Sequence, residues 1–388
     1  MTAPTSQSYT FTAEGSVEDW SQIIRNIDPD NTYLLTNLEE DEDAIDLTKI
    51  WMTDSLQPPQ QNAHPEKVDF TSVESAPRVR LENYCQHVLS SVFVTDAQEK
   101  RKKQGVESEI DYQKEKLFRQ HANDIELALM KNSTQNLAAS NSDSNLLGGI
   151  PFFMQRNSKT CTFAADTDIV TCANHGFRTG MFVMFTSTET LPAVITADEM
   201  YFINKVDDNS FKIFPTIEDA VKNTNVINIA DVGTGDHSVY LENIVDCGNT
   251  AYTTDHVNYA MEYAFNRGGR PDTAIVSGRN KRRFSTFVPT GNQKNRNQKE
   301  KEMQEVTDTY ITDFGTIDLT AHRLQNNTRI DILEMQHWGI SWFDRTHEPD
   351  NIAKKGTYTE AFIESWVTLM CRAPLANCAL TNIKPTRG

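Results

Sequence analysis

The feature that most constrains this chain is a long amphipathic segment at about residues 107–131. Residues suited to a buried face recur in it at the i, i+4, i+7 and i+8 spacing of a helix, namely Ile110, Leu117, His121, Ala122, Ile125, Ala128 and Leu129. Ser108, followed three residues later by Asp111, predicts a capped start. Such a helix would be about 35–40 Å long, as long as a small domain is wide. We therefore expect an elongated molecule with this helix along its length.

Composition limits the class of protein. With 388 residues the chain has room for two or three folding units. Its net charge of −17 produces an average field that repels phosphate, so we do not expect the whole protein to wrap nucleic acid. There is no run of 18 apolar residues, and residues 1–12 lack the basic and apolar regions of an export signal. We expect neither a membrane span nor export.

The cysteines predict a reducing environment. There are six, with no C-x-x-C pair and no regular spacing: Cys85, Cys161, Cys172, Cys247, Cys371 and Cys378. In a chain of this length such a distribution is typical of buried thiols rather than of a disulfide framework. We expect the protein to assemble in the cytosol.

The first 77 residues contain a short helical pattern and a hairpin pattern. Apolar residues recur at helical spacing in residues 17–27, which predicts a helix in an N-terminal arm or, equally, one packed on its own domain. The acidic run 39–43 precedes strand-like residues 45–52, a proline-bearing tip at 56–65 and strand-like residues 67–73. An isolated two-stranded hairpin is marginally stable, so we expect this one to lie on a neighbouring subunit. The alternative is an ordinary surface loop.

Residues 158–241 have the pattern of a separate all-β module. Turn signals separate six short strand candidates, at 169–172, 181–185, 201–206, 211–214, 226–229 and 237–241. This number of strands in so few residues predicts a small barrel or sandwich. If the module is inserted into another domain, its ends near Lys159 and Leu241 must lie close together.

From residue 250 onward the pattern is mixed. A helix at 254–266, a double glycine, a buried strand at 272–276 and a helix at 280–287 predict an α/β unit. Further strands are expected at 306–313, 316–324, 329–334, 338–343, 357–371 and 378–383.

No sequence motif predicts a catalytic centre or a cofactor site. The phosphate-binding glycine loops, the H-E-x-x-H zinc motif and the G-x-S-x-G nucleophile motif are all absent. His175, Cys172 and His237 are conceivable metal ligands, but turn and strand-edge histidines are more often satisfied polar residues. A second acidic cluster could bind a cation or be a solvated loop, and consists of Asp344, His347, Glu348 and Asp350. We expect neither an enzyme nor a metal protein.

One region is concentrated in positive charge. It consists of Arg279, Lys281, Arg282 and Arg283, followed by Lys294, Arg296, Lys299 and Lys301. It could contact nucleic acid or an acidic surface on a neighbouring subunit, such as the run 39–43. The overall acidity of the chain favours the neighbouring subunit.

Several short motifs follow one another in an order that is moderately specific. Before the β-module they are Trp51, Leu56, Pro58 and Asn62-Ala63; Arg78, Arg80-Leu81, Asn83-Tyr84 and Gln86; Val94-Thr95; Gly105, Glu109 and Gln113; and Asn123-Asp124-Ile125-Glu126. After it they are Gly268-Gly269, Pro271-Asp272, Tyr310, Asp313-Phe314-Gly315, Tyr358, Glu360, Ile363, Val367-Thr368-Leu369 and Asn377-Cys378-Ala379. In these residues the chain resembles the major head proteins of SU10-like tailed bacteriophages, which have the HK97-type capsid fold.

This resemblance implies an α+β, HK97-like capsid fold with a small all-β insertion domain. The implied parts are an N-terminal arm (1–39), an E-loop (40–77), a peripheral domain with a spine helix (78–150), the inserted all-β domain (155–243), an axial domain with part of the peripheral sheet (244–350) and returning peripheral-domain strands (351–388). The β-module itself resembles a small domain of phage tail and head proteins, in His175-Gly176, Gly180, Leu191-Pro192, Tyr201-Phe202, Phe211-Lys212, Gly233, Gly235 and His237.

The function implied is that of a major capsid protein, which self-assembles into an icosahedral head and encloses double-stranded DNA. Its implied partners are further copies of the chain in pentamers and hexamers, a portal, decoration proteins where present, and packaged DNA contacted without sequence specificity; no membrane is involved. It would assemble in the host cytoplasm and reside in the virion. The candidate contacts between subunits are Glu40, Asp41, Trp51, Leu56, Pro58, Arg78 and Arg80.

Two other classes remain open. A tail or decoration protein would use the β-module to bind a host glycan, with Phe177, Phe182 and Tyr201 exposed on a concave face. A metal-dependent hydrolase would be centred on His175 and His237.

Overall fold

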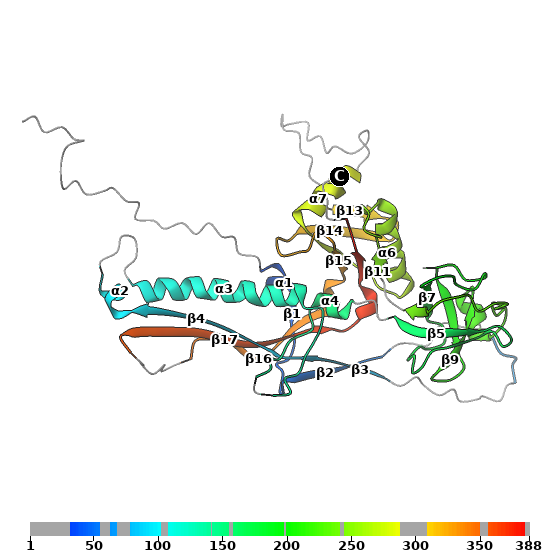
Figure 1. Cartoon of the computed structure of the whole chain (residues 1–388), viewed down its shortest axis with the longest axis horizontal. Helices are drawn as coiled ribbons and strands as arrows, with labels where there is room; N and C mark the ends of the chain where they lie inside the picture. The colour runs from blue at the N-terminus through cyan, green and yellow to red at the C-terminus, as the bar shows by residue number, and fades with distance from the viewer. Residues whose placement is uncertain are drawn as a thin grey trace, which may run out of the picture.

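The computed structural model describes residues 32–54, 63–67, 78–101, 108–140, 142–154, 158–197, 199–240, 244–287, 309–349 and 356–384. Within these ranges the molecule is elongated, with a long helix and two long strands at one end and a small barrel at the other (Figure 1). No helix in the described ranges is both long enough and apolar enough to cross a membrane.

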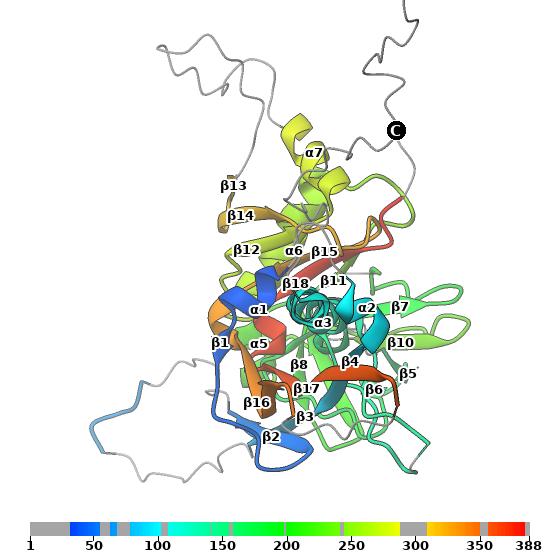
Figure 2. The same cartoon turned by 90° about the vertical axis from the view of Figure 1, so that its left-hand side faces the viewer.

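The helix expected from the periodicity is α3 (Glu109–Lys131). Ser108 caps it by accepting a hydrogen bond from the Asp111 N–H at 3.3 Å, as expected. Its inner face packs on a four-stranded sheet in the order β1 (Glu39–Glu40), β16 (Trp338–His347), β17 (Tyr358–Cys371) and β4 (Gln86–Thr95). Figure 2 looks along α3 and shows it lying above β4 and β17. The opposite side of the helix is exposed, so the molecule is not wrapped around it.

His121 on the inner face of α3 is a satisfied core residue. One ring nitrogen lies 2.8 Å from the Ser365 hydroxyl on β17 and the other 3.1 Å from the Ser90 hydroxyl on β4. Burial lowers the pKa of this imidazole, which favours its neutral form. The histidine therefore joins the helix to both long strands.

A second, six-stranded sheet and the helices packed on it form a unit that we call the axial unit, after the domain expected at 244–350. The order of the sheet is β11 (Ile244–Asp246), β18 (Cys378–Thr381), β15 (Ile330–Leu333), β12 (Thr273–Val276), β14 (Gly315–Ala321) and β13 (Thr309–Thr312), with α6 (Thr254–Asn266) and α7 (Gly278–Phe287) packed on it. One expectation is corrected here. The returning strand at 378–383 was assigned to the peripheral domain, but β18 pairs with β11 and β15 in the axial sheet. Only β17 of the returning strands belongs to the peripheral sheet, where it pairs with β16 and β4.

The β-module is a closed barrel. Its strands run in the order β10 (His237–Tyr240), β5 (Lys159–Ala164), β6 (Ile169–Thr171), β9 (Ser210–Phe214), β8 (Tyr201–Lys205) and β7 (Phe182–Ser187), and β7 closes on β10. A short helix, α5 (Ile217–Lys222), packs on β8 and β9. Lys159 lies opposite Val239, so the two ends of the module are neighbours.

Two strand expectations in this module were wrong. Strand β5 was missed, and residues 226–229 form no strand. The Ile227 N–H donates to the Ile213 carbonyl and the Ile229 N–H to the Asp168 carboxylate, so this segment runs beside the barrel without forming a ladder.

The barrel is fixed to the axial unit through α6. The Arg267 guanidinium lies 3.7 Å from the centre of the Phe182 ring and donates to the Phe182 carbonyl at 2.9 Å. Tyr263 of α6 contacts the same ring. Phe182 is only 2% exposed, so this contact buries an aromatic group on the outside of the barrel.

One strand beside the hairpin was not expected. β2 (Thr48–Thr53) pairs antiparallel with β3 (Val79–Tyr84). Residues 68–73 of the strand expected at 67–73 lie outside the described residues, as does the expected helical pattern at 17–27. The remaining short elements are α1 (Tyr33–Asn37), α2 (Asp96–Lys100), α4 (Ile150–Phe153), η2 (Met335–His337) and η3 (Pro374–Ala376).

A buried asparagine links the end of the hairpin to the peripheral core. The Asn83 amide donates to the Gly148 and Leu369 carbonyls at 2.9 and 2.7 Å, and its oxygen accepts from the N–H groups of Gly148 and Tyr84. Asn83 has no exposed surface, so water cannot take over its hydrogen bonds to these backbone groups if the side chain is removed.

We predict that Asn83→Ala lowers the free energy of unfolding by about 3 kcal/mol, because several buried backbone groups lose their partner. Urea denaturation of the unassembled chain measures this. Asn136→Ala is the control, because the exposed Asn136 side chain donates one hydrogen bond, to the Ser144 carbonyl; it should change the free energy of unfolding by less than about 0.5 kcal/mol. Equal effects at the two sites would contradict the role of Asn83.

Candidate intersubunit interface

The acidic run at 39–43 forms the root of the hairpin and continues the peripheral sheet. β1 pairs in parallel with β16. Beyond β1, the Asp41 N–H donates to the Ile340 carbonyl at 2.9 Å and the Ala44 N–H to the Trp342 carbonyl at 2.7 Å. The backbone that leads into the hairpin is therefore held along the edge of the sheet.

Two arginines of the same chain pair with four of the five carboxylates of this run. Four ion pairs connect them to it: Arg372 with Glu39 at 3.0 Å and with Asp41 at 2.9 Å, and Arg345 with Glu40 at 3.2 Å and with Asp43 at 3.3 Å. Glu40 and Asp41, two of the expected intersubunit contacts, thus have partners within their own chain. We call these six side chains the acidic clasp.

Asp41 is the most buried carboxylate of the clasp. Partial burial acts to raise its pKa, but hydrogen bonds from the Arg372 guanidinium and the Glu42 N–H, with the charges of Arg372 and Lys49, hold the pKa below its usual range. The ionised form is therefore favoured by the folded state.

Trp51 anchors the inner side of the hairpin. Its indole N–H donates to the Cys371 carbonyl at the end of β17 at 3.0 Å. Its ring lies 6.0 Å from that of Phe153, which in turn contacts buried Trp338. The structure places this expected intersubunit residue against the peripheral core of its own chain.

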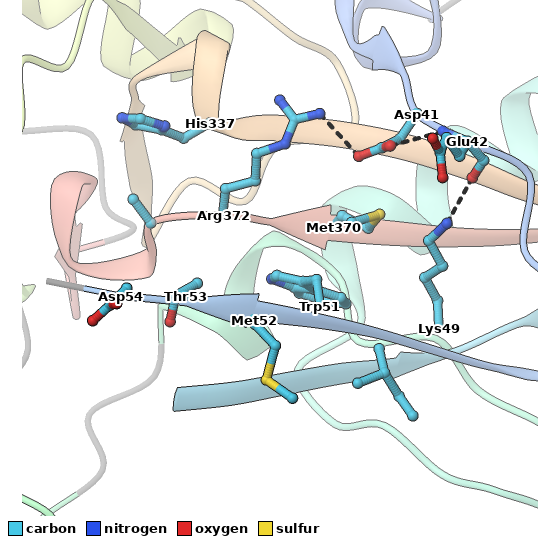
Figure 3. A pocket seen from close by; sticks show the side chains of 12 residues that line it. Asp41, Glu42, Lys49, Trp51, Met52, Thr53, Asp54, His337, Met370 and Arg372 are labelled. Atoms are coloured by element: carbon cyan, nitrogen blue, oxygen red, sulfur yellow. Dashed lines mark hydrogen bonds and ion pairs between the residues drawn. The ribbon is translucent and has the colours of Figure 1, made fainter. Parts of the chain in front are cut away.

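The outer side of β2 is apolar and uncovered within the described residues. Ile50 is 45% and Met52 62% exposed, and Ile45 just before the strand is 97% exposed. Figure 3 shows Met52 pointing to the opposite side of the strand from Trp51. Our sequence analysis missed these residues, although strand alternation about Trp51 could have indicated them.

An open groove of about 620 Å³ lies between the hairpin and the end of β17 (Figure 3). Its lining mixes charged and apolar side chains: Asp41, Glu42, Lys49, Ile50, Trp51, Met52, Thr53, Asp54, His337, Met370, Arg372 and Ala373. The groove is thus formed by the clasp on one side and by both faces of β2 on the other.

The remaining expected contacts are partly placed. Arg78 is exposed and lies 3.8 Å from Asp54, and exposed Arg80 lies 2.7 Å from Glu82. Leu56 and Pro58 lie outside the described residues.

The expected basic patch divides into structural and exposed residues. Lys281 donates to the Leu319 carbonyl at 3.1 Å, and Arg283 donates to the Tyr252 carbonyl at 2.8 Å. Arg279 is half-buried, whereas Arg282 is exposed on α7. Lys294 and Arg296 lie outside the described residues.

The histidines considered as metal ligands are used in other ways. Buried His175 lies 2.9 Å from the Asp207 carbonyl through Nε2 and accepts from the Phe177 N–H through Nδ1. His237 packs its ring against Phe163.

The second candidate cluster is spread over ion pairs. His347 lies 3.6 Å from Asp344, and Glu348 pairs with Lys114 of α3 at 2.7 Å. Asp350 lies outside the described residues. In the part of the chain that the structure describes, no three histidine, cysteine or acidic side chains are grouped to hold a metal ion.

Comparison with known proteins gives a family and a fold. The family model for the SU10 major capsid protein matches residues 3–384. Two solved structures are similar in fold over nearly their whole length. The capsid of a native GTA particle has a TM-score of 0.54 at 7% identity, covering 96% of this chain and 97% of that one. The capsid asymmetric unit of cyanophage A-1(L) has a TM-score of 0.53 at 10% identity, covering 97% and 98%. No curated protein matches this chain.

We predict that Asp41→Asn lowers the free energy of unfolding by about 1 kcal/mol at pH 7, since it removes the clasp charge that Arg372 binds. The pKa of Asp41 is lowered in the folded state, so its contribution is present above about pH 4 and is lost as the pH falls through the folded pKa. Wild type and variant should therefore converge in urea denaturation as the pH falls from about 4 through the folded pKa of Asp41.

The matched control is Asp54→Asn, because Asp54 is exposed and its partner Arg78 is 3.8 Å away. It should shift stability by less than about 0.5 kcal/mol at any pH. A difference between wild type and Asp41→Asn that does not shrink at all as the pH falls below about 4 would refute the assignment.

Proposed function

Because this chain belongs to the SU10 major capsid protein family, we propose that its hairpin joins neighbouring copies of the chain in the shell of a phage head. The protein is a major capsid protein with an HK97-type fold, and it is a component of a virion capsid. Its role is structural.

The observation that supports the hairpin contact is the apolar outer side of β2 on an anchored root. Ile50 and Met52 are exposed, while Trp51 and the acidic clasp fix the strand from the other side. An exposed apolar surface that is held rigid loses little conformational entropy when a partner covers it. Each such contact is small, but a closed shell repeats it many times, so modest contacts make a strong lattice.

The finer organisation is also a proposal. The shell consists of pentamers and hexamers assembled in the host cytoplasm, the N-terminal arm (1–38) clasps another copy, and the head includes a portal and, where present, decoration proteins. Exposed Arg282 on α7 contacts an acidic surface of a neighbouring copy or, without sequence specificity, packaged DNA. Since Glu39, Glu40, Asp41 and Asp43 are already paired with arginines, the acidic clasp is the weaker candidate for that surface.

The structure disfavours the glycan-binding alternative. That function requires exposed aromatic side chains on a concave face of the barrel. Phe177, Phe182 and Tyr201 are 4%, 2% and 6% exposed, so none of the three is available to a ligand. The hydrolase alternative has no support either, because the ring nitrogens of His175 are both taken up by backbone groups.

We predict that Met52→Glu prevents shell formation while the chain still folds. A charge at this exposed position costs the fold little, but it must be desolvated when a second copy covers the hairpin. Each contact should weaken about tenfold or more, and the lattice multiplies that loss. Sedimentation and negative-stain microscopy measure assembly, and circular dichroism confirms folding.

The control is Val206→Glu, which places the same charge at an equally exposed apolar residue of the barrel, 51% exposed. It should assemble as the wild type does. Normal shells from Met52→Glu would show that the outer side of β2 is not a lattice contact.

A further inference from the structure

A fully buried carboxylate of α3 caps the helix that follows the N-terminal segment. Glu126 has no exposed surface, and its two oxygens accept hydrogen bonds from the N–H groups of Leu34 and Leu35 at 2.8 and 2.9 Å. These N–H groups belong to the first turn of α1, where the residue at the N-cap, Thr32, makes no side-chain cap. Glu126 therefore does from 92 positions away what a local cap would do.

The same carboxylate contacts the axial unit. His322, which follows β14, lies with Nε2 3.0 Å from Glu126 Oε1, and both side chains are almost completely buried. The Leu324 N–H donates to Nδ1 of His322, so Nε2 carries the proton. Nε2 is not aligned for a straight hydrogen bond, and the contact is mainly electrostatic.

His322 is itself held by the axial sheet. Its N–H donates to the Val276 carbonyl at the end of β12 at 2.8 Å. The loop after it is tied by Gln325, which donates to buried Asp331 at 2.7 Å. Asp331 pairs with Arg329 at 2.6 Å. The imidazole thus cannot follow Glu126 unless the axial sheet moves with it.

We propose that Glu126 couples the docking of α1 to the position of the axial unit, so that a change in one is transmitted to the other. The carboxylate is buried and needs all its partners, because a buried charge that loses a donor is strongly destabilised. If α1 undocks, Glu126 loses the two N–H donors of Leu34 and Leu35, and His322 is its remaining partner. If His322 shifts, the Glu126 carboxylate loses a stabilising contact, and its capping of α1 weakens. Such coupling is reciprocal by thermodynamic necessity.

If the chain forms a shell as proposed above, this coupling has a consequence for the shell. Residues 1–31 continue directly from α1, and the proposed clasp of a neighbour by this segment would act on α1 first. Through Glu126 and His322, a displacement of α1 would be transmitted to the axial sheet of the same subunit. One contact in the lattice would thereby bias the conformation of a distant part of the chain.

The test is amide hydrogen exchange of the unassembled full chain. In His322→Phe, which keeps a ring but removes the N–H, exchange at Leu34 and Leu35 should rise about tenfold although His322 has no hydrogen bond to α1. Glu126→Gln should raise exchange at the same two amides and also at Leu324 and Gln325. His322→Gln, whose amide restores a donor, should return Leu34 and Leu35 to within about twofold of wild type.

Glu115→Gln is the matched control, since Glu115 is an exposed carboxylate of the same helix that pairs with Arg119 at 3.0 Å. It should leave all four amides unchanged, and unchanged protection of β17 shows that each variant is folded. If Glu126→Gln fails to fold, the two His322 variants decide the question. Exchange at Leu34 and Leu35 that stays at the wild-type rate in His322→Phe would overturn the coupling.

Because no shell is formed in this experiment, its result is independent of the hairpin contact. Failure of Met52→Glu to block assembly would leave the coupling intact, and failure of the exchange test would leave the proposed lattice contact intact.

Discussion

The structure depends on the packing of one face of α3 against two long strands. β17 pairs with β4 on one side and β16 on the other, and His121 joins the helix to both β17 and β4. The hairpin root, α1 and α4 all attach to this slab. Burial of apolar residues between helix and sheet stabilises this packing. The side of the helix that faces away from the sheet is exposed.

Local patterns predicted the helices well and the pairing of strands less well. The periodicity of α3 and of α6 is contained in the segments themselves, so both helices were found with nearly correct limits. A strand shows only which of its faces is buried, not which strand lies beside it. This is why β18 was assigned to the wrong sheet, why β5 was missed, and why the pairing of β2 with β3 was not foreseen.

The same limit applies to the candidate interface. Trp51 was predicted to contact a neighbouring subunit, but only the fold shows that it faces its own core while Met52 faces outward. No local signal connects the acidic run to Arg345 and Arg372, which lie about 300 positions away and reach it only through the pairing of β1 with β16. A run of acidic residues that a sequence suggests is solvent-exposed can instead form ion pairs with basic residues of the same chain.

The adjacency of Lys159 and Val239 gives the barrel an unusual independence from the rest of the chain. The polypeptide enters and leaves the barrel at neighbouring points. The module can therefore be inserted without separating the parts of the main body that come before and after it in the sequence. The stacking of Arg267 on Phe182 and the contact of Tyr263 with the same ring hold the barrel against α6. A domain at this point can be exchanged, lost or gained while the fold of the rest of the subunit stays the same.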